Sequence, residues 1–173
     1  MIQLFVCKIC GEPYLGERSP ADCPYCGAPR KYVKPYGEYS QLWKDAKLTS
    51  VEKENLTKAL AAEVNAMYYY DKVAKTQEKY SKYNRFFKRI STVEQEHIST
   101  IVKFLNIPSP ELKGEEPKGS IEKDIERTKQ LEAEAVRDYT AFVTSSKHRP
   151  VKTLFKALLH AEQGHFDFLD KKQ

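Results

Sequence analysis

Apolar residues recur at three- and four-residue steps from Leu48 onward, which is the spacing of amphipathic helices. Glycine and proline are scarce through most of this part of the chain. The pattern predicts four helices, over approximately residues 49–75, 81–105, 120–146 and 150 to near the C-terminus. Thr49, with Glu52 three residues later, is typical of a capping box at the start of the first helix.

The segment 106–119 contains three prolines and two glycines, so it cannot continue a helix. It is long enough to cross the whole length of a bundle. Two helical hairpins joined by one long crossover are the topology of ferritin-like bundles. The predicted fold is therefore mainly α, with a ferritin-like four-helix bundle.

The first 47 residues have a different composition, because all four cysteines and many turn-forming residues lie there. We expect a small four-cysteine domain over 1–36, a linker over 37–47 and the bundle over 48–173. Four apolar side chains near the linker are expected to pack it against the bundle. They are Tyr36, Tyr39, Leu42 and Trp43.

The net charge of +5 is divided almost evenly between the two parts, so no concentrated basic face for nucleic acid is predicted. No apolar run approaches the roughly 18 residues that a membrane span needs. The first ten residues lack the pattern of a secretory signal. We therefore expect a cytoplasmic protein that binds neither nucleic acid nor membrane.

Two Glu-x-x-His motifs lie in the second and fourth predicted helices, as Glu94 with His97 and Glu162 with His165. Residues three apart project from the same face of a helix. Each motif interrupts a stripe that is otherwise hydrophobic. Both pairs are therefore expected to point into the bundle.

The first and third predicted helices each carry one glutamate on the apolar stripe, Glu63 and Glu132. A tyrosine follows each of them after seven residues, as Tyr70 and Tyr139. The two halves of the bundle therefore look like a degenerate repeat. The tyrosines are expected either as core aromatics or as hydrogen-bond donors to the glutamates.

Four carboxylates buried without compensation would be strongly unfavourable, which favours bound cations in the core. One glutamate from two helices and Glu-x-x-His from the other two is the ligand arrangement of di-iron and di-manganese carboxylate proteins. Oxygen and imidazole donors suit iron or manganese. The predicted ligands are Glu63, Glu94, His97, Glu132, Glu162 and His165.

Other acids and histidines fit this pattern less well. Glu134 lies off the stripe, Glu96 is expected at the surface, and His148 and His160 fit no ligand spacing.

The cysteines form two Cys-x-x-Cys pairs, each followed by glycine. Such paired motifs place four thiolates on one tetrahedral ion. Disulfides are not expected in a cytosolic chain. The predicted ligands are Cys7, Cys10, Cys23 and Cys26. A set of four thiolates accepts either zinc or a single iron.

Two groups of segments resemble a known family. FVCKICGEPYLGE and CPYCGAP resemble a short rubredoxin-like domain, and LAAEVNAMYYY, EQEH, LEAEAVRDY and AEQGH resemble the di-iron domain of rubrerythrins. The resemblance covers nearly the whole chain. The order of the two domains is reversed, because the usual rubrerythrin carries its rubredoxin part last.

The resemblance implies a peroxidase of oxidative-stress defence, in which a di-iron centre reduces hydrogen peroxide to water and the four-cysteine iron resupplies electrons from an unidentified donor protein. One position departs from the family, which typically has a further glutamate where this chain has Ala135. The family's redox-linked movement of iron toward that glutamate is therefore in question, and an activity nearer that of a ferritin-like oxidase is an alternative.

Two other functions remain open from the sequence. One is a ferroxidase or oxygen reductase, and the other is a non-enzymatic interaction protein with a zinc ribbon. We also expect a homodimer, in which the cysteine domain of one chain docks near the bundle of its partner, because the two centres of one chain are expected to be far apart.

Overall fold

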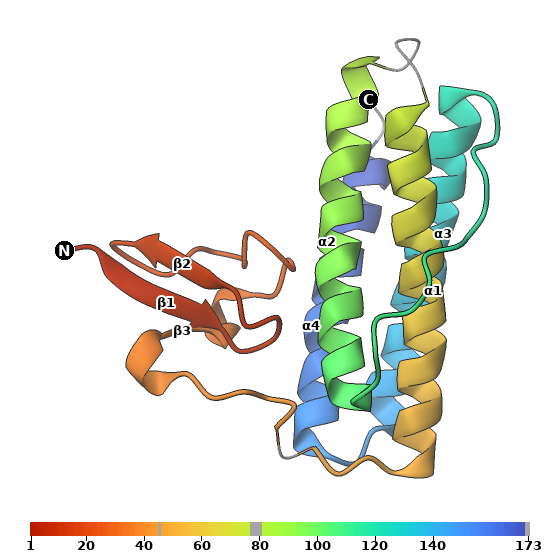
Figure 1. The fold of residues 1–173 in the computed structure, drawn as a ribbon. Helices are drawn as coiled ribbons and strands as arrows, with labels where there is room; N and C mark the ends of the chain where they lie inside the picture. The colour runs from red at the N-terminus through yellow and green to blue at the C-terminus, as the bar shows by residue number, and fades with distance from the viewer. Residues whose placement is uncertain (45, 77–80, 172–173) are drawn as a thin grey trace.

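Four long helices form the larger part of the computed structural model, which describes residues 1–44, 46–76 and 81–171 (Figure 1). They are α1 (Ser50–Lys75), α2 (Ser81–Leu105), α3 (Ile121–Ser145) and α4 (Arg149–Asp170). Within the described residues, the mainly helical fold class that the sequence predicts is confirmed. No helix of this part is both long and apolar enough to cross a membrane.

The helix ends follow the local chemistry of the sequence. At the start of α1 the Thr49 side chain accepts a hydrogen bond from the amide of Glu52, and the Glu52 carboxylate accepts one from the amide of Thr49. This is the expected capping box. Ser120 caps α3 through the amide of Lys123, and Pro150 lies in the first turn of α4, where its missing amide hydrogen costs nothing.

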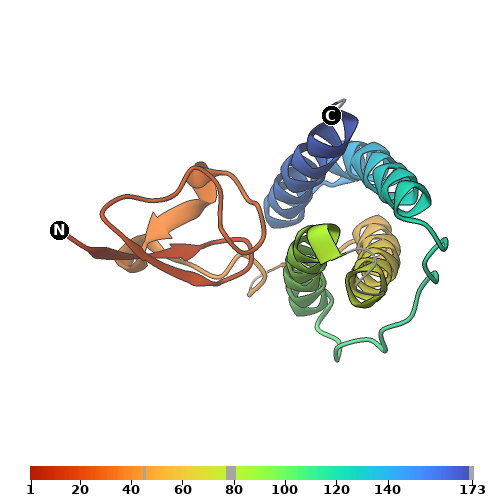
Figure 2. The same cartoon turned by 90° about the horizontal axis from the view of Figure 1, so that it is seen from above.

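The crossover from α2 to α3 passes outside α1 (Figure 2). Asn65 of α1 holds it there, because its side chain accepts a hydrogen bond from the amide of Glu115 at 2.8 Å. Tyr68 of the same helix donates to Glu116 at 2.8 Å. Glycine at position 114 permits this close approach, since a Cβ there would lie 3.0 Å from the Asn65 backbone.

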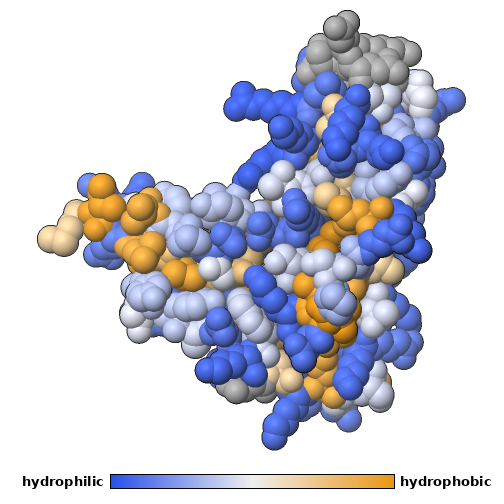
Figure 3. Space-filling model, viewed as in Figure 1, coloured by the Kyte–Doolittle hydropathy of each residue, from blue (hydrophilic) through white to orange (hydrophobic). Residues whose placement is uncertain are grey.

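The N-terminal part is a three-stranded antiparallel sheet in the order β2-β1-β3. Its strands are β1 (Gln3–Cys7), β2 (Pro13–Gly16) and β3 (Val33–Pro35). Short 3-10 turns at Arg30–Tyr32 and Tyr36–Glu38 flank β3. Exposed apolar side chains, including Ile2 and Leu15, gather at the end of the sheet that faces away from the bundle (Figure 3).

The cysteine domain stands against the bundle on the side formed by α2 and α4 (Figures 1 and 2). One continuous hydrophobic core includes residues of both parts. In the linker, Leu42 and Trp43 pack against this core as expected. Tyr36 does not, because its side chain is 64% exposed, so the prediction for this side chain is wrong.

Candidate metal centres

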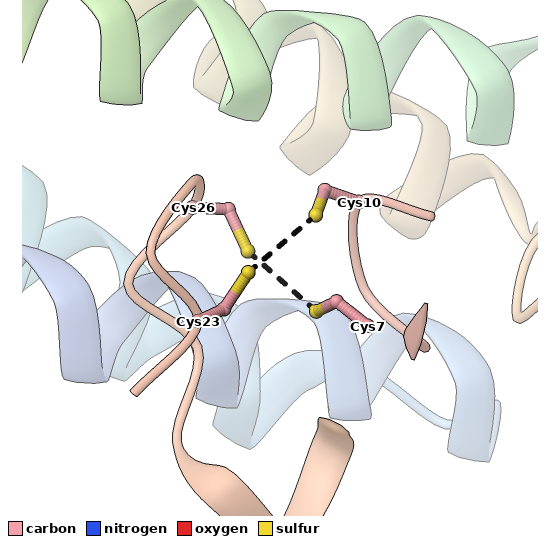
Figure 4. A group of neighbouring side chains, drawn as sticks. All are labelled: Cys7, Cys10, Cys23 and Cys26. Atoms are coloured by element: carbon pink, nitrogen blue, oxygen red, sulfur yellow. Dashed lines mark hydrogen bonds between the residues drawn. The ribbon is translucent and has the colours of Figure 1, made fainter. Parts of the chain in front are cut away.

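The four cysteines converge from two loops, Cys7 and Cys10 from one and Cys23 and Cys26 from the other (Figure 4). The Sγ atoms of Cys7 and Cys26 lie 3.8 Å apart, and so do those of Cys10 and Cys23. In a tetrahedron with metal–sulfur bonds of about 2.3 Å, neighbouring sulfurs lie about 3.8 Å apart. The four thiols are therefore already spaced for one tetrahedral ion.

The two loops have the same backbone construction. The amide of Gly11 donates to the carbonyl of Cys7 at 2.9 Å, and the amide of Gly27 donates to the carbonyl of Cys23 at 3.0 Å. Both glycines have positive φ, +91° and +68°, which disfavours any side chain there. This explains why a glycine follows each Cys-x-x-Cys pair.

Hydrogen bonds among the four thiols shift their pKa values in opposite directions. Hydrogen bonds among them lower the pKa of Cys23 and Cys7 and raise the pKa of Cys10 and Cys26. All four are at most 4% exposed. A buried group of this kind does not lose all its protons unless a cation takes their place, which is the condition of a thiolate metal site.

A second convergence lies inside the bundle, where the six predicted side chains form two overlapping groups. One consists of Glu63, Glu94, His97 and Glu162, and the other of Glu94, Glu132, Glu162 and His165. In each group the ligand atoms lie within 4.8 Å of one another. The glutamate of each Glu-x-x-His motif belongs to both groups, as a carboxylate that bridges two ions does.

Distances within these groups are short. His97 Nδ1 lies 2.9 Å from Glu94 Oε2 and 3.0 Å from Glu162 Oε1, and none of these three atoms has an aligned hydrogen-bond partner. His165 Nδ1 lies 3.1 Å from Glu162 Oε2 and 3.4 Å from Glu132 Oε2. His97 Nδ1 and its two carboxylate neighbours thus approach closely without a hydrogen bond, as ligand atoms around a common ion do.

Burial and charge perturb the pKa values of these groups. Burial, and then the neighbouring Glu162 carboxylate, raise the pKa of Glu132 to about 8 and that of Glu94 well above its usual range. Burial alone would lower the pKa of His97 and His165, but the surrounding carboxylates raise both. Four carboxylates carry the charge that two divalent cations neutralise, so the donor set fits a two-metal site.

Tyr70 and Tyr139 are both buried core aromatics and hydrogen-bond donors to the glutamates, so both predicted roles are present. Tyr70 donates to Glu132 Oε1 at 2.6 Å, and Tyr139 donates to Glu63 Oε1. Burial, and then the adjacent carboxylates, raise the pKa of both phenols well above the usual value. They therefore keep their protons, and each holds one oxygen of an unshared glutamate.

The docking of the two parts brings the two clusters into direct connection. His97 Nε2 lies 3.0 Å from the carbonyl oxygen of Cys26. Because a carbonyl only accepts, Nε2 carries a hydrogen, and Nδ1 is the nitrogen that faces the carboxylates and would bind a metal after losing its own proton. This contact between a residue of each cluster argues against the expectation that the two centres of one chain are far apart. The homodimer inferred from that distance remains a prediction.

Further contacts from α2 and α4 fix this docking. Lys103 of α2 donates to the carbonyl of Cys10 at 3.0 Å, and Arg89 donates to that of Pro24. From α4, His160 lies 3.0 Å from the Asp22 carboxylate.

The remaining side chains weighed as ligands lie elsewhere. His160, which fits no ligand spacing, contacts Asp22 of the cysteine domain instead. His148 binds the Glu52 carboxylate at 2.9 Å, away from both clusters. Glu96, expected at the surface, is half-buried, so that prediction is wrong. Glu134 is exposed and pairs with Arg127.

The sequence contained no signal for two features. One is Arg127, which binds Glu115 of the crossover at 2.5 Å and Glu134 at 3.1 Å. The other is a cavity of about 300 Å³ that reaches the ligand carboxylates from the side of α1 and α3. Ala135, whose departure from the resemblance was noted in the sequence, lines this cavity.

Comparison with known proteins gives one match. A family model described as rubrerythrin matches residues 54–172, which is more than half of the chain. The comparison with curated proteins and the comparison with solved structures found no match. The family consists generally of oxidoreductases, and the carboxylate and histidine clusters are of the di-iron type. With its four-cysteine domain placed first and its di-iron-type bundle second, this chain belongs to the rubrerythrin family.

Proposed function

We propose that the protein is a peroxidase that reduces hydrogen peroxide at a di-iron site in the bundle, with electrons supplied through an iron bound by the four cysteines. The observation that carries this proposal is the hydrogen bond from His97 to the Cys26 carbonyl. It joins a residue of each candidate metal centre within one chain.

When two ferrous ions are bound, each supplies one electron to peroxide, and with two protons the O–O bond is cleaved to give two water molecules. Glu94 and Glu162 would be shared by the two ions, since both belong to each group. Glu63 with His97, and Glu132 with His165, complete the two ends.

The tyrosines position the unshared glutamates. Tyr139 holds Glu63 and Tyr70 holds Glu132, each through a phenolic proton that burial keeps in place. A carboxylate held in this way keeps a fixed orientation beside the ligand cluster. This is the usual role of hydrogen-bonded partners behind metal ligands.

Cys26 and His97 also supply the shortest connection between the two centres that the contacts show. It runs from Cys26 Sγ along covalent bonds to the carbonyl oxygen and through one hydrogen bond of 3.0 Å to the imidazole. His97 is fully buried, so water does not compete for this bond. An electron donor is needed for peroxide reduction but not for iron storage, which favours the peroxidase over a ferroxidase.

The test is to purify the protein anaerobically from iron-supplied cells, count its metals and measure peroxide consumption with a surrogate flavoprotein reductase as donor. We expect two irons for the bundle and one for the cysteines, with turnover that depends on both peroxide and reductant. Zinc at the cysteines and no turnover would refute the electron-transfer part and leave a ferroxidase or an interaction protein. Oxygen in place of peroxide, in the same assay, identifies the preferred oxidant.

A further inference from the structure

The cavity beside the bundle site is strongly acidic. Seven carboxylates and one guanidinium are among its lining residues, together with small side chains such as Ala62, Ala66 and Ala135 that leave it open. The acids are Glu63, Glu94, Glu115, Glu132, Glu134, Asp138 and Glu162. A concave, acid-lined surface focuses a negative potential and concentrates cations.

The lining residues lead from solvent to the ligands. Glu134 and Asp138 lie at the outer end, with side chains 48% and 44% exposed. At the inner end Glu94 is 1% exposed, and both of its carboxylate oxygens lack an aligned hydrogen-bond partner. The nearest cationic groups to this carboxylate are the imidazoles of His97 and His165, at 2.9 and 3.4 Å, which are themselves predicted ligands. A buried carboxylate without hydrogen bonds, surrounded by other ligand side chains, is placed to take a metal ion.

Arg127 is the cation among the lining residues, and it lies at the outer end. It binds Glu115 of the crossover at 2.5 Å and Glu134 of its own helix at 3.1 Å. The Glu115 carboxylate also accepts from Lys118 at 2.8 Å, and Asp138 pairs with Arg137 at 2.9 Å. The outer end of the cavity is its mouth. Arg127 thus forms ion pairs with two carboxylates of the mouth and weakens their attraction for an incoming cation.

We propose that this cavity between α1 and α3 is the route by which divalent metal ions enter the two-metal site, with Glu134 and Asp138 as transit carboxylates and Arg127 as the restraint on the mouth. The site also approaches solvent at His165, whose side chain is 18% exposed. That opening presents an imidazole, whereas the cavity presents a succession of carboxylates. A hard divalent cation favours the second.

The inference rests on the bundle site being a metal site, and it concerns how metal arrives rather than what the loaded protein does. The test uses metal-free full-length protein mixed rapidly with Co²⁺. Visible absorption of the carboxylate- and imidazole-bound ion gives the rate of loading, separately from the stronger thiolate bands of the four-cysteine site. The final cobalt content of each variant is measured afterwards.

The double variant Glu134→Gln/Asp138→Asn is expected to load about tenfold more slowly at low salt, because electrostatic focusing typically raises association rates by about 10-fold or more. The difference should shrink at high salt. Arg127→Gln is expected to load faster than the wild type. The matched control is Glu122→Gln/Glu126→Gln, which removes the same charge from α3 at residues outside the cavity lining.

Equal rates in the mouth variant and the control would overturn the proposal, because the effect would then be one of net charge or of another route. A lower final cobalt content in the mouth variant would also overturn it, since Glu134 or Asp138 would then be a ligand. Failure of the wild type to bind cobalt in the bundle would instead refute the two-metal site itself. The cobalt content of the wild-type bundle therefore distinguishes a failure of the proposed entry route from a failure of the two-metal site.

Discussion

Replacing Gly27 by alanine tests the docking of the cysteine domain on the bundle. Gly27 has φ +68°, and a Cβ built on it would lie 2.9 Å from the Cβ of Ala161 on α4. Ala161 is 5% exposed and has no rotamer through which to move away. The substitution therefore forces the loop of Cys26 away from α4 and puts the bond between Cys26 and His97 under strain.

Two effects determine how much free energy of unfolding the Gly27→Ala variant loses. The left-handed backbone disfavours alanine by about 1–2 kcal/mol. Overpacking against Ala161 adds about 1–3 kcal/mol. The Gly27→Ala variant is expected to lose the sum, about 2–5 kcal/mol, from the free energy of unfolding.

Gly119→Ala is the matched control, because Gly119 has φ +83° with nothing within 4 Å of the added Cβ. The Gly119→Ala variant should lose only the about 1–2 kcal/mol that alanine costs in a left-handed backbone. Ala161→Gly restores the missing space for the Gly27→Ala variant, at a helix-propensity cost of about 1 kcal/mol in its own right. The double variant should therefore be more stable than the sum of the two single effects, by about 1–3 kcal/mol.

Denaturant unfolding of the four variants at equal metal content measures these values. The reasoning is refuted if Gly27→Ala costs no more than Gly119→Ala and shows no coupling with Ala161→Gly. The proposed function adds a second readout: in the reduced, iron-loaded protein, Gly27→Ala should slow the oxidation of the four-cysteine iron by peroxide, and Ala161→Gly should restore that rate in the double variant. Gly119→Ala should leave that rate unchanged.

Three further predictions concern Glu52, Tyr70 and the metals. Burial alone would raise the pKa of Glu52, but hydrogen bonds from Thr49 and His148 lower it from 4.5 to about 2. Glu52→Gln should thus lose about 3 kcal/mol of stability at pH 7. Because the folded pKa is depressed, this loss should vanish as the pH falls from about 4.5 toward 2, and acid titrations of stability that stay parallel would contradict it. Tyr70→Phe should leave the buried Glu132 carboxylate without its hydrogen-bond donor and lower the free energy of unfolding by about 1–3 kcal/mol. It should also weaken metal binding, as measured by calorimetric titration. Unchanged metal affinity would exclude a positioning role for Tyr70. Removal of the metal ions from both centres should lower the thermal midpoint, since a ligand at about 1,000 times its Kd stabilises the folded state by about 4 kcal/mol. Equal midpoints with and without chelator would argue against a stabilising role of the metals.

The sequence predicted the helices and the convergence inside the bundle because both depend on local spacing. Glu63 and Glu132 are out of place on apolar stripes, and each Glu-x-x-His motif fixes its two side chains on one face. Once the helices pack, these faces meet, and the structure brings all six side chains together. The four cysteines were predictable for the same reason, since each pair is set by its own turn.

The contacts between the two parts of the chain could not be read from spacing. The bond from His97 to Cys26 joins residues 71 positions apart, and nothing in either motif indicates a partner outside it. The same holds for Arg127 and Glu115, which meet only because the crossover passes outside α1. Tyr36 was misjudged because an aromatic residue beside a linker need not face the core.

The most direct test of the proposed function is to mix the fully reduced, iron-loaded protein rapidly with one equivalent of hydrogen peroxide and record the absorption of the oxidised four-cysteine iron. The account predicts that this absorption appears within the first turnover, and much faster than in a Glu63→Ala variant that lacks a complete bundle site. An equally slow appearance in both proteins, or peroxide consumption while the four-cysteine iron stays reduced, would contradict it.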